Sequence, residues 1–100
     1  MKIYQFHPEF AWDNNESYQE MDEFEAGSVE EVLEKVKEII NPDTEAEWAE
    51  DFYLTASNGE KEVFDFHFMS KLRNVTVLED AETLFKILKL ELMELFKDEQ

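Results

Sequence analysis

The sequence predicts an α+β protein, a small two-layer sandwich with two helices on one face of an antiparallel sheet of four to five strands, in the order ββαββ(β)α. Three observations lead to this prediction. The 100 residues are 43% hydrophobic and 14% aromatic, which is enough for one core. Two segments repeat apolar residues at helical spacing. Asn58-Gly59, between two apolar segments, indicates a β-hairpin. A single acidic domain over residues 1–100 is therefore expected.

The N-terminal segment predicts two strands joined by a loop. Residues 2–7 loosely alternate polar and apolar side chains, and Pro8 is expected to end this strand because proline cannot donate to a sheet ladder. Residues 8–17 contain turn-forming residues and are expected to form a loop. Residues 18–26 are expected to form a second, weaker strand.

The first helix is predicted to begin after Ser28, because Ser28 and Glu31 have the spacing of a capping box. An apolar stripe of Val, Leu and Ile follows at helical spacing. Pro42 ends the helix, since the residue before a proline avoids the helical region. A second capping-box pattern predicts a short helical turn over residues 44–50.

Residues 52–57 and 60–68 are expected to pair as the hairpin. A two-residue loop would place the apolar residues of the first strand on the face opposite to the three Phe residues of the second. A three-residue loop pairs Phe52 with Phe64 and gathers all of these side chains on one face. Because a one-residue slip moves every side chain across the sheet, burial favours the three-residue loop, with Gly59 in the left-handed conformation as a bulge.

The C-terminal segment predicts a short fifth strand over residues 75–78 and a helix over 81–97, which Asp80 is expected to cap. Leu90 and Met93 are expected to point away from its core face. That core face is formed by Ala81, Leu84, Phe85, Leu88, Leu92, Leu95 and Phe96, with Ile87 widening the stripe.

Charge is the strongest functional signal. The chain has 26 acidic residues against 9 Lys and Arg, and its formal net charge is −17. Residues 1–51 carry 16 acids and 3 lysines, whereas residues 52–100 carry 10 acids and 6 bases. Solubility needs a net charge magnitude of only about 2 to 8, and self-repulsion costs stability. The excess therefore indicates a basic partner and opposes direct binding to nucleic acid or to an anionic membrane.

Several functional classes lack support in the sequence. The absence of cysteine excludes disulfides, thiolate metal sites and cysteine nucleophiles. Neither a signal peptide nor a membrane span is evident, so a cytoplasmic location in a bacterium or an infected host cell is expected. Asp65 and His67 share one strand face and could orient an imidazole for base catalysis, but a solvated sheet face explains them better. No enzyme activity, no cofactor and no metal site is expected.

The acidic residues are interleaved with aromatic ones, a combination suited to docking a basic protein. Charges speed the encounter and exclude wrong partners, while aromatic side chains supply desolvated anchors. The alternative is that the aromatic residues fold under their loops as core and the acids are merely solvated. The predicted partner-binding residues are Glu9, Trp12, Asp13, Glu16, Glu20, Asp22, Glu23, Glu25, Glu45, Glu47, Trp48, Glu50 and Asp51.

Two functional hypotheses follow. In the first, a non-catalytic binding protein blocks the basic groove of a nucleic-acid-handling protein. In size, charge and lack of cysteine the chain is similar to small acidic phage-encoded inhibitors, including anti-CRISPR and DNA-mimic proteins, and to bacterial nuclease immunity proteins. That resemblance implies carboxylates in the place of phosphates. The alternative is an interaction or assembly module, such as a homodimer through Leu90 and Met93, in which the charge serves solubility.

Overall fold

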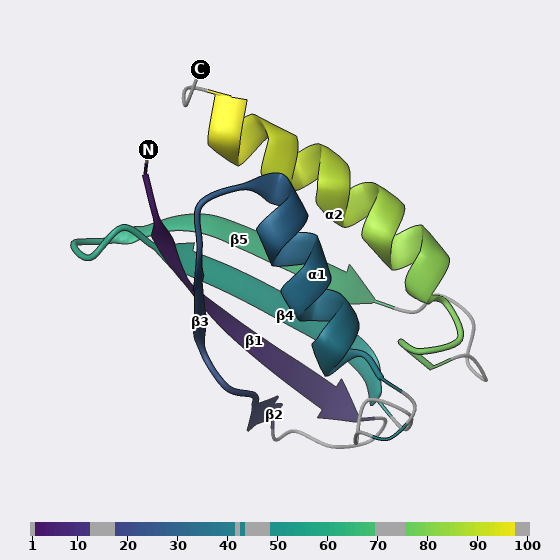
Figure 1. Cartoon of the computed structure of the whole chain (residues 1–100). Helices are drawn as coiled ribbons and strands as arrows, with labels where there is room; N and C mark the ends of the chain where they lie inside the picture. The colour runs from purple at the N-terminus through teal and green to yellow at the C-terminus, as the bar shows by residue number, and fades with distance from the viewer. Residues whose placement is uncertain (1, 13–17, 42, 44–48, 70–75, 98–100) are drawn as a thin grey trace.

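The computed structural model describes residues 2–12, 18–41, 43, 49–69 and 76–97. The predicted two-layer α+β sandwich is confirmed, with both helices side by side on one face of a five-stranded sheet (Figure 1). The elements in chain order are β1 (Tyr4–Trp12), β2 (Tyr18–Glu20), β3 (Phe24–Ala26), α1 (Val29–Ile39), β4 (Ala49–Ser57), β5 (Glu62–Met69) and α2 (Ala81–Phe96).

The sheet is antiparallel throughout and is built around β1. The strand order is β2-β1-β4-β5, and β3 pairs with the same edge of β1 as β2 does. The expected strand over 18–26 is therefore split into two short strands. Residues 21–23 interrupt the pairing, since they form three residues opposite only two in β1.

β1 passes through Pro8, so the expectation that this proline ends the strand is wrong, and residues 8–12 are strand rather than loop. The carbonyl of Pro8 accepts a hydrogen bond from the N–H of Met21 at 2.9 Å. The backbone polar groups of Pro8 thus face the interrupted edge between β2 and β3. The N–H that proline lacks falls where the ladder is already broken, and a strand tolerates proline at such a place.

The predicted start of α1 is confirmed in its details. The Ser28 hydroxyl accepts a hydrogen bond from the N–H of Glu31 at 3.2 Å, which satisfies one of the free donors at the helix start. The helix ends at Ile39, ahead of Pro42 as expected. Of the turn expected over 44–50, Ala49 and Glu50 instead begin β4, and the other residues lie outside the described part of the chain.

The hairpin between β4 and β5 has the predicted apolar face but not the predicted register. Phe52 pairs with Phe68 rather than with Phe64, a shift of four residues. The loop is longer than three residues because the Asn58 side chain organises it, accepting hydrogen bonds from the N–H groups of Glu60 and Lys61 at 3.0 and 3.1 Å. Gly59 has the expected positive φ, 95°. An even shift preserves the face of every side chain, so the inward Phe residues remain inward.

The segment before α2 is a turn rather than a strand where it is described, over residues 76–80. Val77 nevertheless joins the core. It is fully buried, and its N–H donates to the carbonyl of Ala49 at 2.7 Å. Asp80 precedes α2 but makes no side-chain capping hydrogen bond, contrary to expectation. Ile87 is 43% exposed and does not widen the core stripe, again contrary to expectation.

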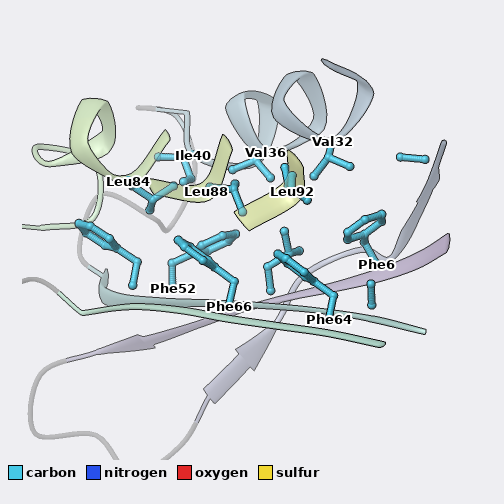
Figure 2. Packing of buried hydrophobic residues seen from close by; sticks show 14 of the residues in the cluster. Phe6, Val32, Val36, Ile40, Phe52, Phe64, Phe66, Leu84, Leu88 and Leu92 are labelled. Carbon is cyan, nitrogen blue, oxygen red and sulfur yellow. The ribbon is translucent and has the colours of Figure 1, made fainter. Parts of the chain in front are cut away.

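The core lies between the helices and the inner face of the sheet (Figure 2). Phe6 stacks on Phe24 with ring centroids 5.3 Å apart, so β3 is held to β1 by side chains as well as by the ladder. Phe10 is fully buried and packs on Phe52, which makes it core rather than a docking anchor. The fully buried large side chains include Phe6, Phe10, Phe52, Leu54, Leu84, Leu88, Leu92, Val32 and Val36.

Candidate protein-docking face

The candidate site is the face of the sheet opposite to the helices, called here the open face. No helix or strand of the described residues covers it (Figure 1). Alternation along the strands determines its residues, because successive side chains point to opposite faces and cross-strand partners share a face. The open-face residues include Gln5, His7, Glu9, Ala11, Glu20, Glu25, Asp51, Tyr53, Thr55, Ser57, Asp65, His67 and Met69.

The open face is acidic and has no fixed positive charge. Within the described strands there is no Lys or Arg. The described Lys residues instead lie near the N-terminus, in the β4–β5 loop and on the two helices. The described strands thus lack fixed positive charge, whereas the two helices carry Lys together with Glu residues. The carboxylates on or beside the open face are Glu9, Glu20, Glu23, Glu25, Asp51 and Asp65.

One row of side chains crosses four strands at the same level. Glu9 lies opposite Glu20 on β2 and opposite Tyr53 on β4, and Tyr53 lies opposite His67 on β5. The rings of Tyr53 and His67 are stacked, with centroids 3.9 Å apart and planes at 11°. Like charges directly opposite each other destabilise a strand pair. The Glu9–Glu20 pair therefore costs stability, while the stacked rings stabilise the other end of the row.

Glu23 lies beside the open face although it belongs to no strand. One of its carboxylate oxygens lies 2.9 Å from His7 Nδ1, and the other accepts a hydrogen bond from the Gln5 side-chain amide at 3.1 Å. Both partners are open-face residues of β1. These two contacts hold the carboxylate of Glu23 over the edge of β1, between Glu20 and Glu25 in the chain.

Asp51 is an open-face residue whose surroundings shift the pKa of its carboxyl group. Desolvation raises the pKa of its carboxyl group above the ordinary value of 3.8, and the charge of His67 opposes that rise. Asp51 is only partly buried, and its cross-strand partners are Ala11 and Met69. Its neighbours in the sheet are thus apolar, which explains why the charged form loses solvation there.

The structure brings five of the predicted partner-binding residues together on one face. Glu9, Glu20, Glu23, Glu25 and Asp51 lie on or beside the open face. Asp22 is exposed between β2 and β3, and Glu50 is half-buried near the start of β4. Those outside the described residues are Asp13, Glu16, Glu45, Glu47, Trp48 and the side chain of Trp12.

The open face also contains residues that were not among the predicted partner-binding residues, and four of them have ionisable or aromatic side chains: His7, Tyr53, Asp65 and His67. Asp65 and His67 do share the outward face that their spacing predicted. The signal that could have identified Tyr53 is its position two residues after Asp51, which places both side chains on one face. Its stacking on His67 depends on the register between β4 and β5, which the sequence alone predicted incorrectly.

Two hollows border the open face. The one beside His7, Glu9 and Glu20 has a volume of about 30 Å³, and the one beside Gln5, Glu25 and Ser57 has a volume of about 180 Å³. Within the described ranges, no three His, Asp or Glu side chains come together in a way that would hold a metal ion. Neither α1 nor α2 combines the length and the apolar character needed to cross a lipid bilayer.

Comparisons with protein families, with curated proteins and with solved structures found no match to this chain. The chemistry of the open face consists of carboxylates on a sheet, with the stacked rings of Tyr53 and His67 among them.

Proposed function

We propose that this protein is a non-catalytic acidic binding protein, and that its open face occupies the basic, nucleic-acid-binding surface of a partner protein. The observation that carries the proposal is an acidic sheet face without fixed positive charge. Six carboxylates lie on or beside one sheet face, and the described strands that form it contain no Lys or Arg. A surface of one sign steers a partner of the opposite sign and excludes others.

The layout of the carboxylates suits a partner that normally binds phosphates. Glu25 and Glu20 lie opposite Gln5 and Glu9, and Glu23 contacts His7 between them. Gln5 and Glu9 are four residues apart on β1, so Glu25 and Glu20 lie about 13 Å apart along its edge, with the Glu23 carboxylate between them. A nucleic-acid strand likewise presents negative charge at regular intervals. A row of carboxylates on a rigid strand would therefore substitute for a stretch of phosphates.

The aromatic pair favours arginine in the partner. Tyr53 and His67 present stacked rings in the row that also holds Glu9. Guanidinium groups stack on aromatic faces and bind carboxylates through two parallel hydrogen bonds. Arginine is also the residue that most often recognises phosphate in a planar, bidentate way. The open face thus combines both kinds of contact that an arginine-rich groove can use.

The proposal is tested with two variants of equal net charge. In the face variant, Glu9→Gln, Glu20→Gln and Glu25→Gln neutralise three open-face carboxylates while retaining Glu23, which contacts His7. In the control variant, Glu30→Gln, Glu34→Gln and Glu38→Gln neutralise three exposed carboxylates of α1, in the other layer of the sandwich. Each protein is titrated into a panel of basic nucleases and CRISPR effector complexes bound to labelled DNA or RNA, and release of the nucleic acid is measured.

Wild-type protein and the control variant are expected to release nucleic acid from at least one member of the panel, and the face variant is expected to do so roughly 5- to 160-fold less well. This range corresponds to about 0.3 to 1 kcal/mol for each lost charge contact. Equal inhibition by the two variants would contradict the assignment of the open face. A panel of which no member binds the wild-type protein at low salt would contradict the proposed class of partner.

A further inference from the structure

The outer side of α2 carries a row of exposed apolar side chains. Leu90 is 66% exposed, Met93 51% and Ile87 43%. The opposite side of the helix is buried against the core through Leu84, Leu88, Leu92 and Phe96. At 3.6 residues per turn, Leu90 lies directly opposite the centre of that buried side, with Ile87 and Met93 flanking it. This row is called the α2 ridge.

The α2 ridge lies on a helix of low net charge. From its N-cap Asp80 to its C-cap Lys97, α2 holds four acidic residues and three lysines, in a chain whose net charge is −17. Like-charge repulsion would oppose contact between two copies of this protein almost anywhere else, above all at the open face. The open face is the face of the sheet that points away from the layer containing α2 (Figure 1). A second copy would therefore approach α2 with the least repulsion.

We propose that α2 pairs with α2 of a second copy in an antiparallel arrangement, with a two-fold axis beside Leu90. In such a pair, residues equally far before and after Leu90 lie at the same level. Leu90 then meets Leu90 of the second copy, and Ile87 lies at the level of Met93. Charges are complementary as well, because Lys86 lies at the level of Glu94 and both are only about 40° from Leu90 around the helix.

Charge selects the antiparallel arrangement over the parallel one. A parallel pair in register would place Lys86 beside Lys86 and Glu94 beside Glu94. Within one copy, Lys86 already pairs with Glu82 at 3.7 Å and Glu94 with Lys97 at 3.3 Å, and all four side chains are largely exposed. In the antiparallel pair, the Glu82–Lys86 ion pair of one copy lies next to the Glu94–Lys97 ion pair of the other, which makes a network of four charges across the interface. The two-fold axis gives the dimer two such networks.

The dimer is expected to be reversible. Three exposed side chains per copy are far fewer than the roughly 20 to 30 residues per side of a standard interface, so dissociation on dilution into the low micromolar range is expected. Because the helices form the inner layers of such a dimer, the two sheets lie outermost and the two open faces point in opposite directions. If the proposed function is correct, the dimer would present two docking faces.

Sedimentation velocity tests the association directly, from a few micromolar to about 1 mM, a range that spans weak to moderate affinities. The wild-type protein is expected to convert from monomer to dimer across this range. Leu90→Glu is expected to remain monomeric at every concentration, with helix content by circular dichroism unchanged because Leu90 contributes nothing to the core. A wild-type chain that stays monomeric at about 1 mM, or a Leu90→Glu variant that dimerises like wild type, would overturn the proposal.

Charge reversal tests the register. Lys86→Glu and Glu94→Lys are each expected to weaken the homodimer at least fivefold, because each places like charges at one level. An equimolar mixture of these two variants is expected to form a heterodimer, and a chain with both changes is expected to regain the wild-type affinity. Glu60→Lys, in the exposed β4–β5 loop, controls for net charge. Failure of both the mixture and the double variant to restore association would overturn the antiparallel register.

Discussion

Replacing Glu20 by lysine is expected to stabilise this fold, although it alters a residue of the proposed docking face. Glu20 lies directly opposite Glu9 in the antiparallel pair of β1 and β2. Directly opposed side chains in a sheet have Cβ atoms about 5 Å apart, well inside the range of unscreened Coulomb repulsion. Glu20→Lys converts this repulsion into an attraction without touching the core.

The magnitude follows from the cross-strand pair. An opposed charge pair is worth roughly 0.2 to 1 kcal/mol relative to a neutral one, with the sign set by the charges. Glu20→Lys removes the repulsion of a like pair and adds the attraction of an unlike pair. Together these two effects raise the free energy of unfolding by about 1 kcal/mol. In a domain of this size, 1 kcal/mol corresponds to about 4 to 8 °C in Tm. Glu20→Gln removes only the repulsion, so about half of this gain is expected.

Urea unfolding followed by far-ultraviolet circular dichroism measures the effect at two ionic strengths. Glu60→Lys changes the net charge equally, at an exposed position in the β4–β5 loop, and so reports the general benefit of lowering the charge of the chain. The difference between the two variants isolates the Glu9–Glu20 pair. This difference is expected near 0.1 M salt and is expected to shrink at 1 M salt, where the Debye length falls from about 10 Å to about 3 Å.

Two results would refute the reasoning. If Glu20→Lys stabilises no more than Glu60→Lys at low salt, then Glu9 and Glu20 do not repel each other as the register requires. If the advantage of Glu20→Lys is the same at high salt, the gain is not electrostatic. Stabilisation together with loss of partner binding is the pattern expected where a binding surface is maintained at a cost in stability.

Two further predictions concern Asp51 and Gly59. Desolvation raises the pKa of Asp51, so the folded state favours its protonated form, and stability is expected to fall as pH rises through the raised pKa. Asp51→Asn is therefore expected to raise stability at neutral pH and to lose that advantage as pH falls below 3.8, the ordinary value; an equal advantage at all pH values in urea unfolding would contradict this. Gly59 has φ of 95°, and a methyl group in place of its hydrogen would meet no other atom within 4 Å. Gly59→Ala is thus expected to cost about 1 kcal/mol through backbone conformation alone, and Gly59→Asn less. Equal unfolding midpoints for wild type and the alanine variant would show that the backbone of this loop relaxes.

The faces of the strands follow from the sequence, whereas their pairing does not. Phe64 and Phe66 alternate with Asp65 and His67, and this period of two assigns each side chain to the inner or the outer face. The predicted register was nevertheless four residues away from the observed one. Both registers bury the same Phe residues, so burial on one strand pair cannot choose between them. The observed register is the one in which Asn58 makes its hydrogen bonds within the loop and the whole core packs together.

Pro8 illustrates how tertiary pairing overrides a local rule. Proline was expected to end a strand because it cannot donate a hydrogen bond to a ladder. That rule applies only where a neighbouring strand needs the donor. The interruption of pairing at residues 21–23 removes the need, and β1 continues to Trp12. No local pattern around Pro8 indicates where an edge strand further along the chain will break.

By itself, the sequence determined the fold class, the capped start of α1, the buried side of α2 with Leu90 and Met93 outside it, and the excess of acid in the first half of the chain. These features depend on the spacing of neighbouring residues, which the backbone geometry of a helix or a strand converts directly into faces. Only the tertiary structure decided which acids meet. Glu9 lies beside Glu20 and Tyr53 because three strands pair in one register. Pairing energy is similar for registers that differ by an even number of residues, so packing of the complete core was needed to select one.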